Sequence, residues 1–259
     1  MFFEADIQIL LDRKLHYLII GTAAIAAFGY WLNDFYDQYR DSINKPHKKG
    51  IRRLGLTVVI GHLVIFSVVA LLSGYLMNLL FLYSFGAILL ALWLYNLKLK
   101  DVPLMGNIII SMLCFLSIYM VSWLFPEIDI RLLLHFGVIA ALLTWCRELV
   151  KDAEDVKGDG LSGSKTIAVT MGTDFTNKLV YFSILFVISF VAISVYYQSQ
   201  YFAGMLQYVY WGYYLFFIVV PLYKVAIQIR MMATPSEYNG LSKMLKYVIF
   251  TGILSILFF

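Results

Sequence analysis

Eight long apolar stretches separated by short polar segments constrain this chain more than any other feature. They cover residues 15–33, 54–73, 75–94, 106–125, 131–149, 177–199, 204–223 and 245–258. The hydrocarbon core of a bilayer is about 30 Å thick, and a helix of roughly 20 apolar residues crosses it. The stretches are continuously apolar rather than alternating, which is typical of helices and not of barrel strands. We therefore predict an all-α, polytopic membrane bundle of about eight transmembrane helices, with residues 1–259 forming one integral membrane domain.

Composition excludes other protein classes. Hydrophobic residues make up 61% of the chain and charged residues 14%, against about 45–50% and about 25% in soluble domains. A cytosolic enzyme, a disordered chain and a disulfide scaffold are therefore excluded. Residues 13–30 superficially resemble a signal peptide, but the apolar run continues to Leu32 and a basic segment follows it. No nucleotide-binding, zinc or nucleic-acid motif occurs, so we expect the bilayer as a partner, and neither nucleic acid nor an obligate protein.

The basic residues predict the orientation in the membrane. Seventeen of the twenty lysines and arginines fall in four segments, 34–53, 95–105, 147–178 and 224–246. Eight helices place these segments on one face, while the opposite loops contain only Arg131. The positive-inside rule makes the basic face cytoplasmic.

Half of the sixteen acidic residues lie in two short segments at the cytoplasmic ends of the first and fifth stretches. We call residues 33–41 the first acidic segment and residues 147–159 the second acidic segment. Carboxylates near membrane depth are kept where they pair or bind an ion. Residues four apart share a helix face, which groups Asn33, Asp37 and Asp41 in the first segment. The same spacing groups Arg147, Lys151, Asp155 and Asp159 in the second, with Asp152 adjacent.

Lysine and arginine residues lie near these rows of acidic residues. Carboxylates and basic residues together indicate a site that binds an anion together with hard metal cations. Mg²⁺ suits such a site because it takes a few carboxylates and completes its shell with water and phosphate oxygens. Each segment could instead be a solvated loop of alternating charge, but two segments with one spacing, side and helix-end position favour a functional site.

The two segments also have matched spacing. Asn33, Asp37 and Asp41 recur as Lys151, Asp155 and Asp159 at a constant offset of 118 residues. Four stretches begin with each segment's own helix, which predicts two pseudo-repeated four-helix halves in parallel orientation. A parallel repeat would bring both segments to the same face across a pseudo-two-fold axis.

The motifs resemble those of a known family. Asn33-x-x-x-Asp37-x-x-x-Asp41, followed by Ile43-Asn44-Lys45-Pro46, resembles the first aspartate-rich motif of the UbiA superfamily of intramembrane prenyltransferases. The segment from Arg147 to Asp159, with Gly163-Ser164-Lys165-Thr166 after it, is similar to the second motif and most similar to that of digeranylgeranylglyceryl phosphate synthase-like members. Tyr95-Asn96-Leu97-Lys98 and Gly106-Asn107 match a weaker signature between them.

Two features depart from the family pattern. Family members usually have two helices before the first motif, whereas this chain has one, so we expect either a lost helix or a recorded start that is too late. The family commonly reads Arg-Pro-x-Arg-Pro after Asn44, whereas this chain has Lys45-Pro46-His47-Lys48-Lys49. The charge is kept, but bidentate recognition by guanidinium is not.

The resemblance implies transfer of a polyprenyl group from its diphosphate to a lipophilic acceptor in the bilayer. Its metal ligands would be Asn33, Asp37, Asp41, Asp152, Asp155 and Asp159, binding Mg²⁺, and its catalytic carboxylates would be Asp37, Asp41, Asp155 and Asp159. The diphosphate would be held by Lys151, Arg147, Lys98 and Lys48. The expected acceptor is geranylgeranylglyceryl phosphate.

Two alternatives remain at this point. An aromatic ring, as in quinone biosynthesis, could be the acceptor in the same chemistry. An ion-coupled transporter is the alternative from another class, but a transporter site is expected near the bilayer midplane on interrupted helices. Here the acidic residues lie at helix ends, which favours the enzyme.

Overall fold

The computed structural model describes residues 11–44 and 54–259, and within these ranges it contains helices and no strands. Eight helical runs in the described ranges are long and apolar enough to cross a membrane, which confirms the predicted all-α fold class. They are Arg13–Tyr36 (α2), Leu56–Met77 (α4), Leu79–Leu97 (α5), Met105–Leu124 (α6 and α7), Ile130–Glu154 (α8), Thr173–Ser199 (α11), Met205–Ile229 (α12, η3 and α13) and Pro235–Phe258 (α14 and η4).

The last span begins earlier than predicted. Helix α14 starts at Pro235 rather than at residue 245 because a capping box closes its N-terminus: the Glu237 side chain accepts from the backbone N–H of Thr234 at 2.9 Å. The first turns of α14 carry polar residues, which lower the hydropathy there although the backbone is helical. Hydropathy therefore located the apolar part of this helix and missed its amphipathic beginning.

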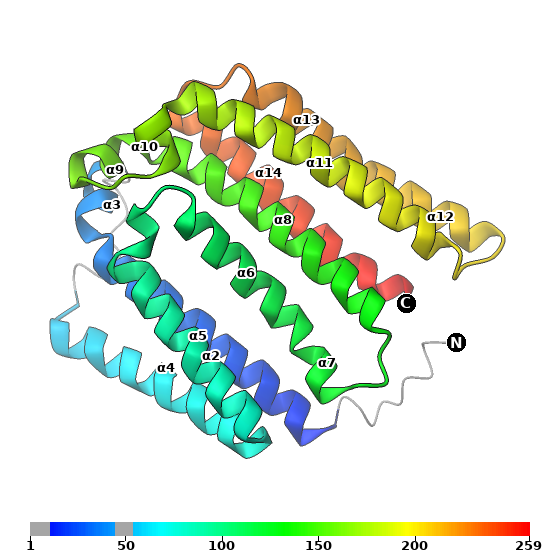
Figure 1. The fold of residues 1–259 in the computed structure, drawn as a ribbon, viewed down its shortest axis with the longest axis horizontal. Helices are drawn as coiled ribbons and strands as arrows, with labels where there is room; N and C mark the ends of the chain where they lie inside the picture. Colours follow the sequence, from blue (N-terminus) through cyan, green and yellow to red (C-terminus); the bar gives the residue numbers. More distant parts are fainter. Residues whose placement is uncertain (1–10, 45–53) are drawn as a thin grey trace. The chain divides into compact units, whose positions relative to one another are not determined.

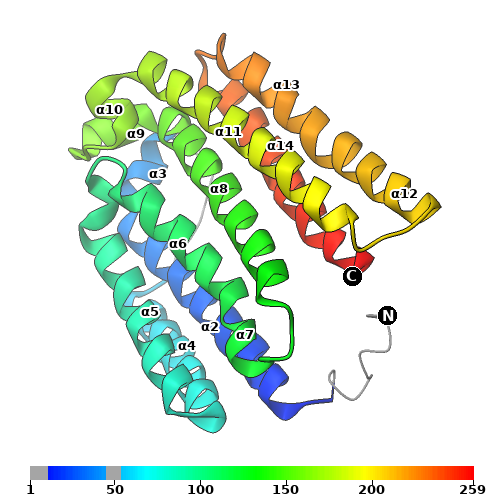
Figure 2. The ribbon, with the colours of Figure 1, turned by 45° about the vertical axis from the view of Figure 1, so that its right-hand side comes forward.

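The described residues form two compact units that divide the chain after the third span. The first unit comprises the described parts of residues 1–106 together with residues 157–164. In it, α2, α4 and α5 pack against one another (Figures 1 and 2). A single residue, Asn78, joins α4 to α5, and its side chain accepts from the N–H of Phe81 at 3.1 Å. Gly74 allows this tight turn, since a Cβ there would lie 2.9 Å from the backbone of Leu82.

The second unit comprises residues 107–156 and 165–259. Its central element is α8, which packs against α11 and α14 and is the most buried of the spans (Figure 2). Between α12 (Met205–Tyr214) and α13 (Val220–Ile229) the helix widens into a π turn at Leu215–Val219. Pro221 lies two residues after the end of this turn, and because proline has no N–H to donate, it interrupts the regular series of helical hydrogen bonds there.

Apolar side chains cover the outside of the spans. On α4, Val64, Ile65, Val68 and Leu72 are each more than half exposed. Such a surface is unfavourable in water and favourable in lipid. The spans therefore present hydrocarbon side chains outward. Their backbone N–H and C=O groups are paired within each helix, as a membrane span requires.

The predicted repeat is visible in the local structure of both acidic segments. Helix α2 ends at Tyr36, Asp37 is its C-cap, and the short helix α3 (Gln38–Asn44) follows. Helix α8 ends at Glu154, Asp155 is its C-cap, and the short helix α9 (Val156–Ser162) follows. Both short helices have seven residues, and their bounds differ by the same 118 positions as the sequence motifs.

The two breaks also share their backbone conformation. Asp37 has φ −90° and ψ 9°, and Asp155 has φ −95° and ψ 6°. Each aspartate N–H donates to the carbonyl four residues earlier, at 2.9 Å for Asp37 and 2.8 Å for Asp155. The compact units hold three and five spans, so their division does not follow four-helix halves. The repeat is therefore clearest at the two helix breaks.

Candidate active site

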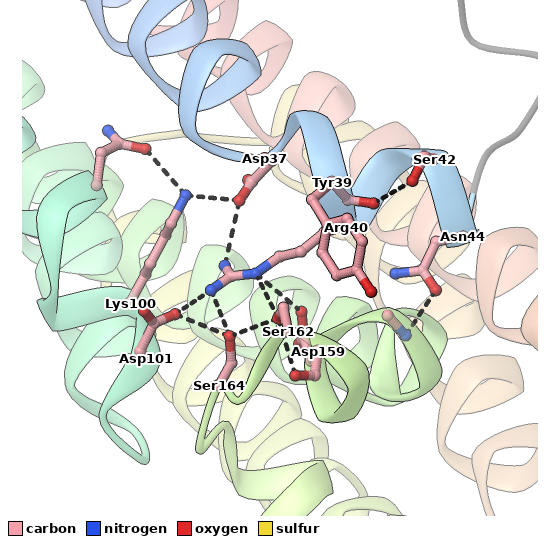
Figure 3. Close-up of polar contacts among 12 residues, drawn as sticks. Asp37, Tyr39, Arg40, Ser42, Asn44, Lys100, Asp101, Asp159, Ser162 and Ser164 are labelled. Atoms are coloured by element: carbon pink, nitrogen blue, oxygen red, sulfur yellow. Dashed lines mark hydrogen bonds and ion pairs between the residues drawn. The ribbon is translucent and has the colours of Figure 1, made fainter.

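Charged side chains of the first unit gather around the guanidinium group of Arg40, on α3 (Figure 3). The group, which we call the Arg40 cluster, consists of Asp37, Arg40, Lys100, Asp101, Asp159, Ser162 and Ser164. Its members come from three parts of the chain: the break after α2, the 3₁₀ turn Leu99–Asp101 (η2), and α9 with the residues after it. Tertiary packing brings together side chains that are far apart in sequence.

Each nitrogen of the Arg40 guanidinium has its own partners. Nη1 lies 3.1 Å from Oδ1 of Asp37. Nε donates to the Ser162 hydroxyl at 3.0 Å and lies 3.8 Å from Oδ1 of Asp159. Nη2 donates to two further oxygens, one each from Asp101 and Ser164. The planar guanidinium group has five N–H donors pointing in different directions, so it can bond to several segments of the chain at once. A lysine has all its donors on one nitrogen and is less suited to this role.

Lys100 adds a second cation to the same carboxylate. Its Nζ lies 2.7 Å from Oδ1 of Asp37 and 3.4 Å from the side-chain oxygen of the buried Asn96. The Lys100 side chain is only 8% exposed. Burial lowers the pKa of Lys100 below its ordinary value, although Asp37 opposes this shift. Lys100 is thus a desolvated cation at the end of an apolar span.

The carboxylates balance these cations. Burial alone would lower the pKa of Arg40, but Asp37, Asp101 and Asp159 together raise it. The Asp159 side chain is 9% exposed and that of Asp37 16%. Removing one partner from such a desolvated pair typically destabilises a protein by about 3–5 kcal/mol. Three carboxylates and two cations leave the cluster with one net negative charge.

A glycine-terminated helix brings the last two members of the cluster into place. Gly163 follows α9 with φ 80°, in the left-handed region that favours glycine. The N–H of Gly163 donates to the carbonyl of Gly160 at 3.2 Å, and the N–H of Ser164 donates to that of Asp159 at 3.0 Å. This pair of bonds is the Schellman motif. It turns the chain back, so that the Ser164 hydroxyl donates to Asp101 at 3.0 Å.

The short helices α3 and α9 meet in an antiparallel pairing that follows the repeat. Arg40 contacts Ser162, and the Asn44 side chain accepts from the N–H of Gly158 at 2.9 Å. With the offset of 118, Arg40 corresponds to Gly158 and Asn44 to Ser162, so each contact is the repeat-related copy of the other. A two-fold contact has this reciprocal form. Glycine suits position 158 because a Cβ there would lie too close to the Asn44 amide nitrogen, so that side chain would have to shift.

In the second unit the cations of α8 are held by a neighbour on the same helix. Nη1 of Arg147 lies 2.8 Å from Oε1 of Glu148, and Nζ of Lys151 lies 3.0 Å from its Oε2. Glu148 is buried, at 9% exposure. One carboxylate therefore orients both cations that the sequence predicts as diphosphate ligands. Further along α8, the Asn107 amide donates to Oδ2 of Asp152 at 3.0 Å.

The structure distributes the predicted site residues as follows. Asp37 and Asp159 lie in the Arg40 cluster, whereas Asn33 and Asp41 flank Asp37 along the chain and bond to it through backbone groups. Lys98 is the exposed C-cap of α5, and Lys48 lies outside the described residues. Sequence reasoning missed five members of the cluster, namely Arg40, Lys100, Asp101, Ser162 and Ser164.

The donor types in the Arg40 cluster suit magnesium. Carboxylate and hydroxyl oxygens are the hard ligands that Mg²⁺ prefers. Within residues 11–44 and 54–259, no three histidine, cysteine or acidic side chains are arranged to hold a metal as they stand. Both cations contact Oδ1 of Asp37 rather than Oδ2. The residues therefore fit the ion by chemistry, with Arg40 and Lys100 occupying one side of the carboxylate.

Apolar spans with a charged cluster at the end of α2 define a multi-pass membrane protein with a polar site at the membrane boundary. The sequence profile of the UbiA prenyltransferase family matches residues 2–250. The chain belongs to this family, which confirms the resemblance of its motifs, and it is an integral, multi-pass membrane protein.

Curated relatives support the same assignment. The chain is 33% identical over 207 residues to digeranylgeranylglyceryl phosphate synthase of Sulfurisphaera tokodaii, covering 74% of this chain and 71% of that protein. It is 32% identical over 168 residues to the enzyme of the same name from Thermococcus sibiricus, covering 63% of this chain and 58% of that protein. The match thus spans less than two thirds of the Thermococcus relative.

Solved structures share the fold. A digeranylgeranylglyceryl phosphate synthase structure superposes with a TM-score of 0.64 at 22% identity, covering 98% of this chain and 86% of that chain. A UbiA homologue from Archaeoglobus fulgidus bound to DMAPP and Mg²⁺ gives 0.65 at 15% identity, covering 94% and 87%. At these identities the likeness shows the fold.

Proposed function

We propose that residues 1–259 form one prenyltransferase domain that moves a polyprenyl group from its diphosphate to a lipophilic acceptor. The observation that carries this proposal is the Arg40 cluster. Acidic, basic and hydroxyl side chains from distant parts of the chain converge there at the end of apolar spans. Such a site suits a substrate with a charged diphosphate head and a hydrocarbon tail. The positive-inside rule supports placing it at the cytoplasmic face.

Magnesium is the proposed cofactor. Its proposed ligands are one amide and five aspartates of the two acidic segments: Asn33, Asp37, Asp41, Asp152, Asp155 and Asp159. When bound, the ion neutralises charge that develops on the departing diphosphate. The family membership and the Mg²⁺ bound to the Archaeoglobus fulgidus homologue support this role.

The proposed task of the basic residues is to hold the diphosphate oxygens. Lys151 and Arg147 are oriented for this by Glu148, and Lys98 and Lys48 are the further ligands predicted from the sequence. The structure adds Lys100, whose ammonium group is desolvated and lies beside Asp37. A cation in such an environment binds an anion more strongly than one in water. These groups fix the diphosphate while the prenyl chain lies among apolar helices, where water that would quench the carbocation is excluded.

The best-supported acceptor is geranylgeranylglyceryl phosphate, because the curated relatives of the chain carry the name digeranylgeranylglyceryl phosphate synthase. In that reaction a glycerol hydroxyl oxygen forms an ether bond to the allylic carbon while the carbon–oxygen bond to the diphosphate breaks, and the hydroxyl proton passes to the released pyrophosphate or to solvent. The site's cations hold the diphosphate that leaves.

The test is incubation of the purified protein in lipid nanodiscs with Mg²⁺, labelled geranylgeranyl diphosphate and a panel of acceptors. We expect a prenylated ether lipid and pyrophosphate in equal amounts with geranylgeranylglyceryl phosphate. If product forms only with an aromatic acceptor, the proposed acceptor is wrong and the proposed reaction, prenyl transfer, still holds. No transfer to any acceptor, with unchanged diphosphate, would contradict the proposed function.

A further inference from the structure

We propose that Arg40 is a positioning residue that joins the first acidic segment to α9, and that Asp101 holds it in place. This inference deepens the proposed function and rests on it. Arg40 stands one turn after Asp37 on α3, and its side chain ends at Asp159, Ser162 and Ser164. These three residues lie more than 115 positions later in the sequence. A single side chain therefore connects both aspartate-rich parts of the chain.

The geometry of Arg40 indicates a connecting role rather than substrate contact. Nη1, Nε and Nη2 each have a carboxylate partner, namely Asp37, Asp159 and Asp101. The side chain is 16% exposed, so little of it can meet a ligand. Asp101 also accepts from the Ser164 hydroxyl at 3.0 Å. The Asp101 carboxylate thus fixes both the guanidinium and the turn after α9.

The repeat shows why one arginine serves both segments. Arg40 and Gly158 occupy equivalent positions in α3 and α9. Glycine at 158 makes room for Asn44, whereas arginine at 40 extends to the opposite helix. The pairing of α3 with α9 is therefore symmetric in the positions that meet and asymmetric in charge, and Arg40 contacts Asp37 just before α3 and Asp159 in α9.

This role makes a definite prediction for metal binding. Asp37 and Asp159 are both proposed magnesium ligands, and like charges repel when they are brought together. If Arg40 positions them, its loss weakens Mg²⁺ binding. If Arg40 merely competes with the ion for the same oxygens, its loss strengthens Mg²⁺ binding. The direction of the change separates the two roles.

The experiment compares Arg40→Gln, Arg40→Lys and Asp101→Asn with the wild-type protein in nanodiscs. Arg131→Gln is the matched control, because Arg131 forms an exposed ion pair with Asp129 at 2.8 Å outside the cluster. The first readout is the Mg²⁺ concentration that half-saturates prenyl transfer. The second is hydrogen exchange of the backbone amides in residues 157–164, which requires neither metal nor substrate.

We expect Arg40→Gln to raise the half-saturating Mg²⁺ concentration by roughly tenfold or more, as changes around metal ligands commonly do. Amides in residues 157–164 should exchange about tenfold faster, because the segment loses its anchor. Arg40→Lys keeps the positive charge but lacks the several N–H donors of the guanidinium group. It should therefore change the half-saturating Mg²⁺ concentration and the exchange rate less than Arg40→Gln does. Asp101→Asn should move both readouts in the same direction, and Arg131→Gln should move neither.

Tighter or unchanged Mg²⁺ binding in Arg40→Gln, with wild-type exchange in residues 157–164, would overturn the inference. If Arg40→Gln fails to fold, Asp101→Asn decides: tighter or unchanged Mg²⁺ binding with wild-type exchange in residues 157–164 would overturn the inference. A wild-type protein that transfers no prenyl group would instead contradict the proposed function. The exchange measurement would then still test whether Arg40 anchors α9.

Discussion

The two helix breaks have the same backbone and different charge partners. At each, a long apolar helix ends at an aspartate C-cap and a seven-residue helix follows. At the first break, the cations Arg40 and Lys100 contact carboxylates from other segments of the chain. At the second, Arg147 and Lys151 contact Glu148 on their own helix.

This difference indicates that the cations near the two breaks have different roles. Arg40 bridges several segments and holds the first break to its neighbours, which is a structural task, whereas Lys100 adds a cation beside the Asp37 carboxylate. Cations that are oriented by an adjacent buried carboxylate keep a fixed direction without joining segments, which suits ligand binding. The repeated backbone thus gives two similar carboxylate positions, and the nearby cations differ in their partners: Arg40 joins segments at the first break, whereas Glu148 orients the two cations of α8 at the second.

The largest expected effect comes from the aspartates that the breaks share. Asp37→Ala and Asp155→Ala should each reduce prenyl transfer by about 10²–10³-fold or more, because each removes a proposed stabiliser of the diphosphate charge. Both variants should insert into membranes normally, since the apolar spans are unchanged. Steady-state kinetics and membrane fractionation check this. Full turnover in either variant would remove the magnesium-ligand role from that break.

Glu148→Gln tests the binding role of the second break. Glutamine keeps the size of the side chain and removes the charge that orients Arg147 and Lys151. We expect KM for the prenyl diphosphate to rise by about tenfold, which corresponds to the loss of one charged hydrogen bond, with a smaller change in kcat. Glu154→Gln is the matched control on the same helix, because glutamine can still accept from Asn239, which donates to Glu154 at 2.8 Å. Equal KM values in the two variants would contradict the orienting role.

A smaller effect is expected from the contact that pairs the short helices. Gly158→Ala should lower the free energy of unfolding by about 1–3 kcal/mol, because its methyl group overlaps the Asn44 side chain. Thermal unfolding in detergent measures this loss. In the double variant with Asn44→Ala, the overlap is relieved, and the combined loss should be less than the sum of the two single losses. Strict additivity would show that the two residues do not pack together.

Much of the fold follows from the sequence because hydrophobicity is a local property. The apolar stretches identified the spans, and the 118-residue offset of three polar positions identified two equivalent segments; the structure adds that the helix breaks in the same way in each. Helix α8 extends past its predicted apolar stretch to Glu154 because the polar residues of the second acidic segment continue the helix. Hydropathy finds the membrane portion of a helix, whereas backbone hydrogen bonds determine where the helix ends.

The composition of the Arg40 cluster could not be predicted in the same way. Arg40, Asp101 and Ser164 lie in polar segments where a charge or hydroxyl usually faces solvent, and only tertiary packing brings them together. The lysine that contacts Asp37 is Lys100 rather than Lys98 because α5 ends at Leu97. Lys98 has φ −151° and ψ −36°, which is not a helical conformation. The direction of the side chains after Leu97 therefore cannot be read from helical spacing in the sequence.

The most direct test of a magnesium-dependent diphosphate site is equilibrium binding of geranylgeranyl thiodiphosphate, which resists cleavage, to the protein in nanodiscs. We expect binding to weaken by about a hundredfold, close to 2.7 kcal/mol, when Mg²⁺ is removed with a chelator. Asp37→Ala should bind equally weakly with and without Mg²⁺. Wild-type affinity that is the same in the chelator, or unchanged by loss of the Asp37 carboxylate, would contradict a magnesium-held diphosphate at this site.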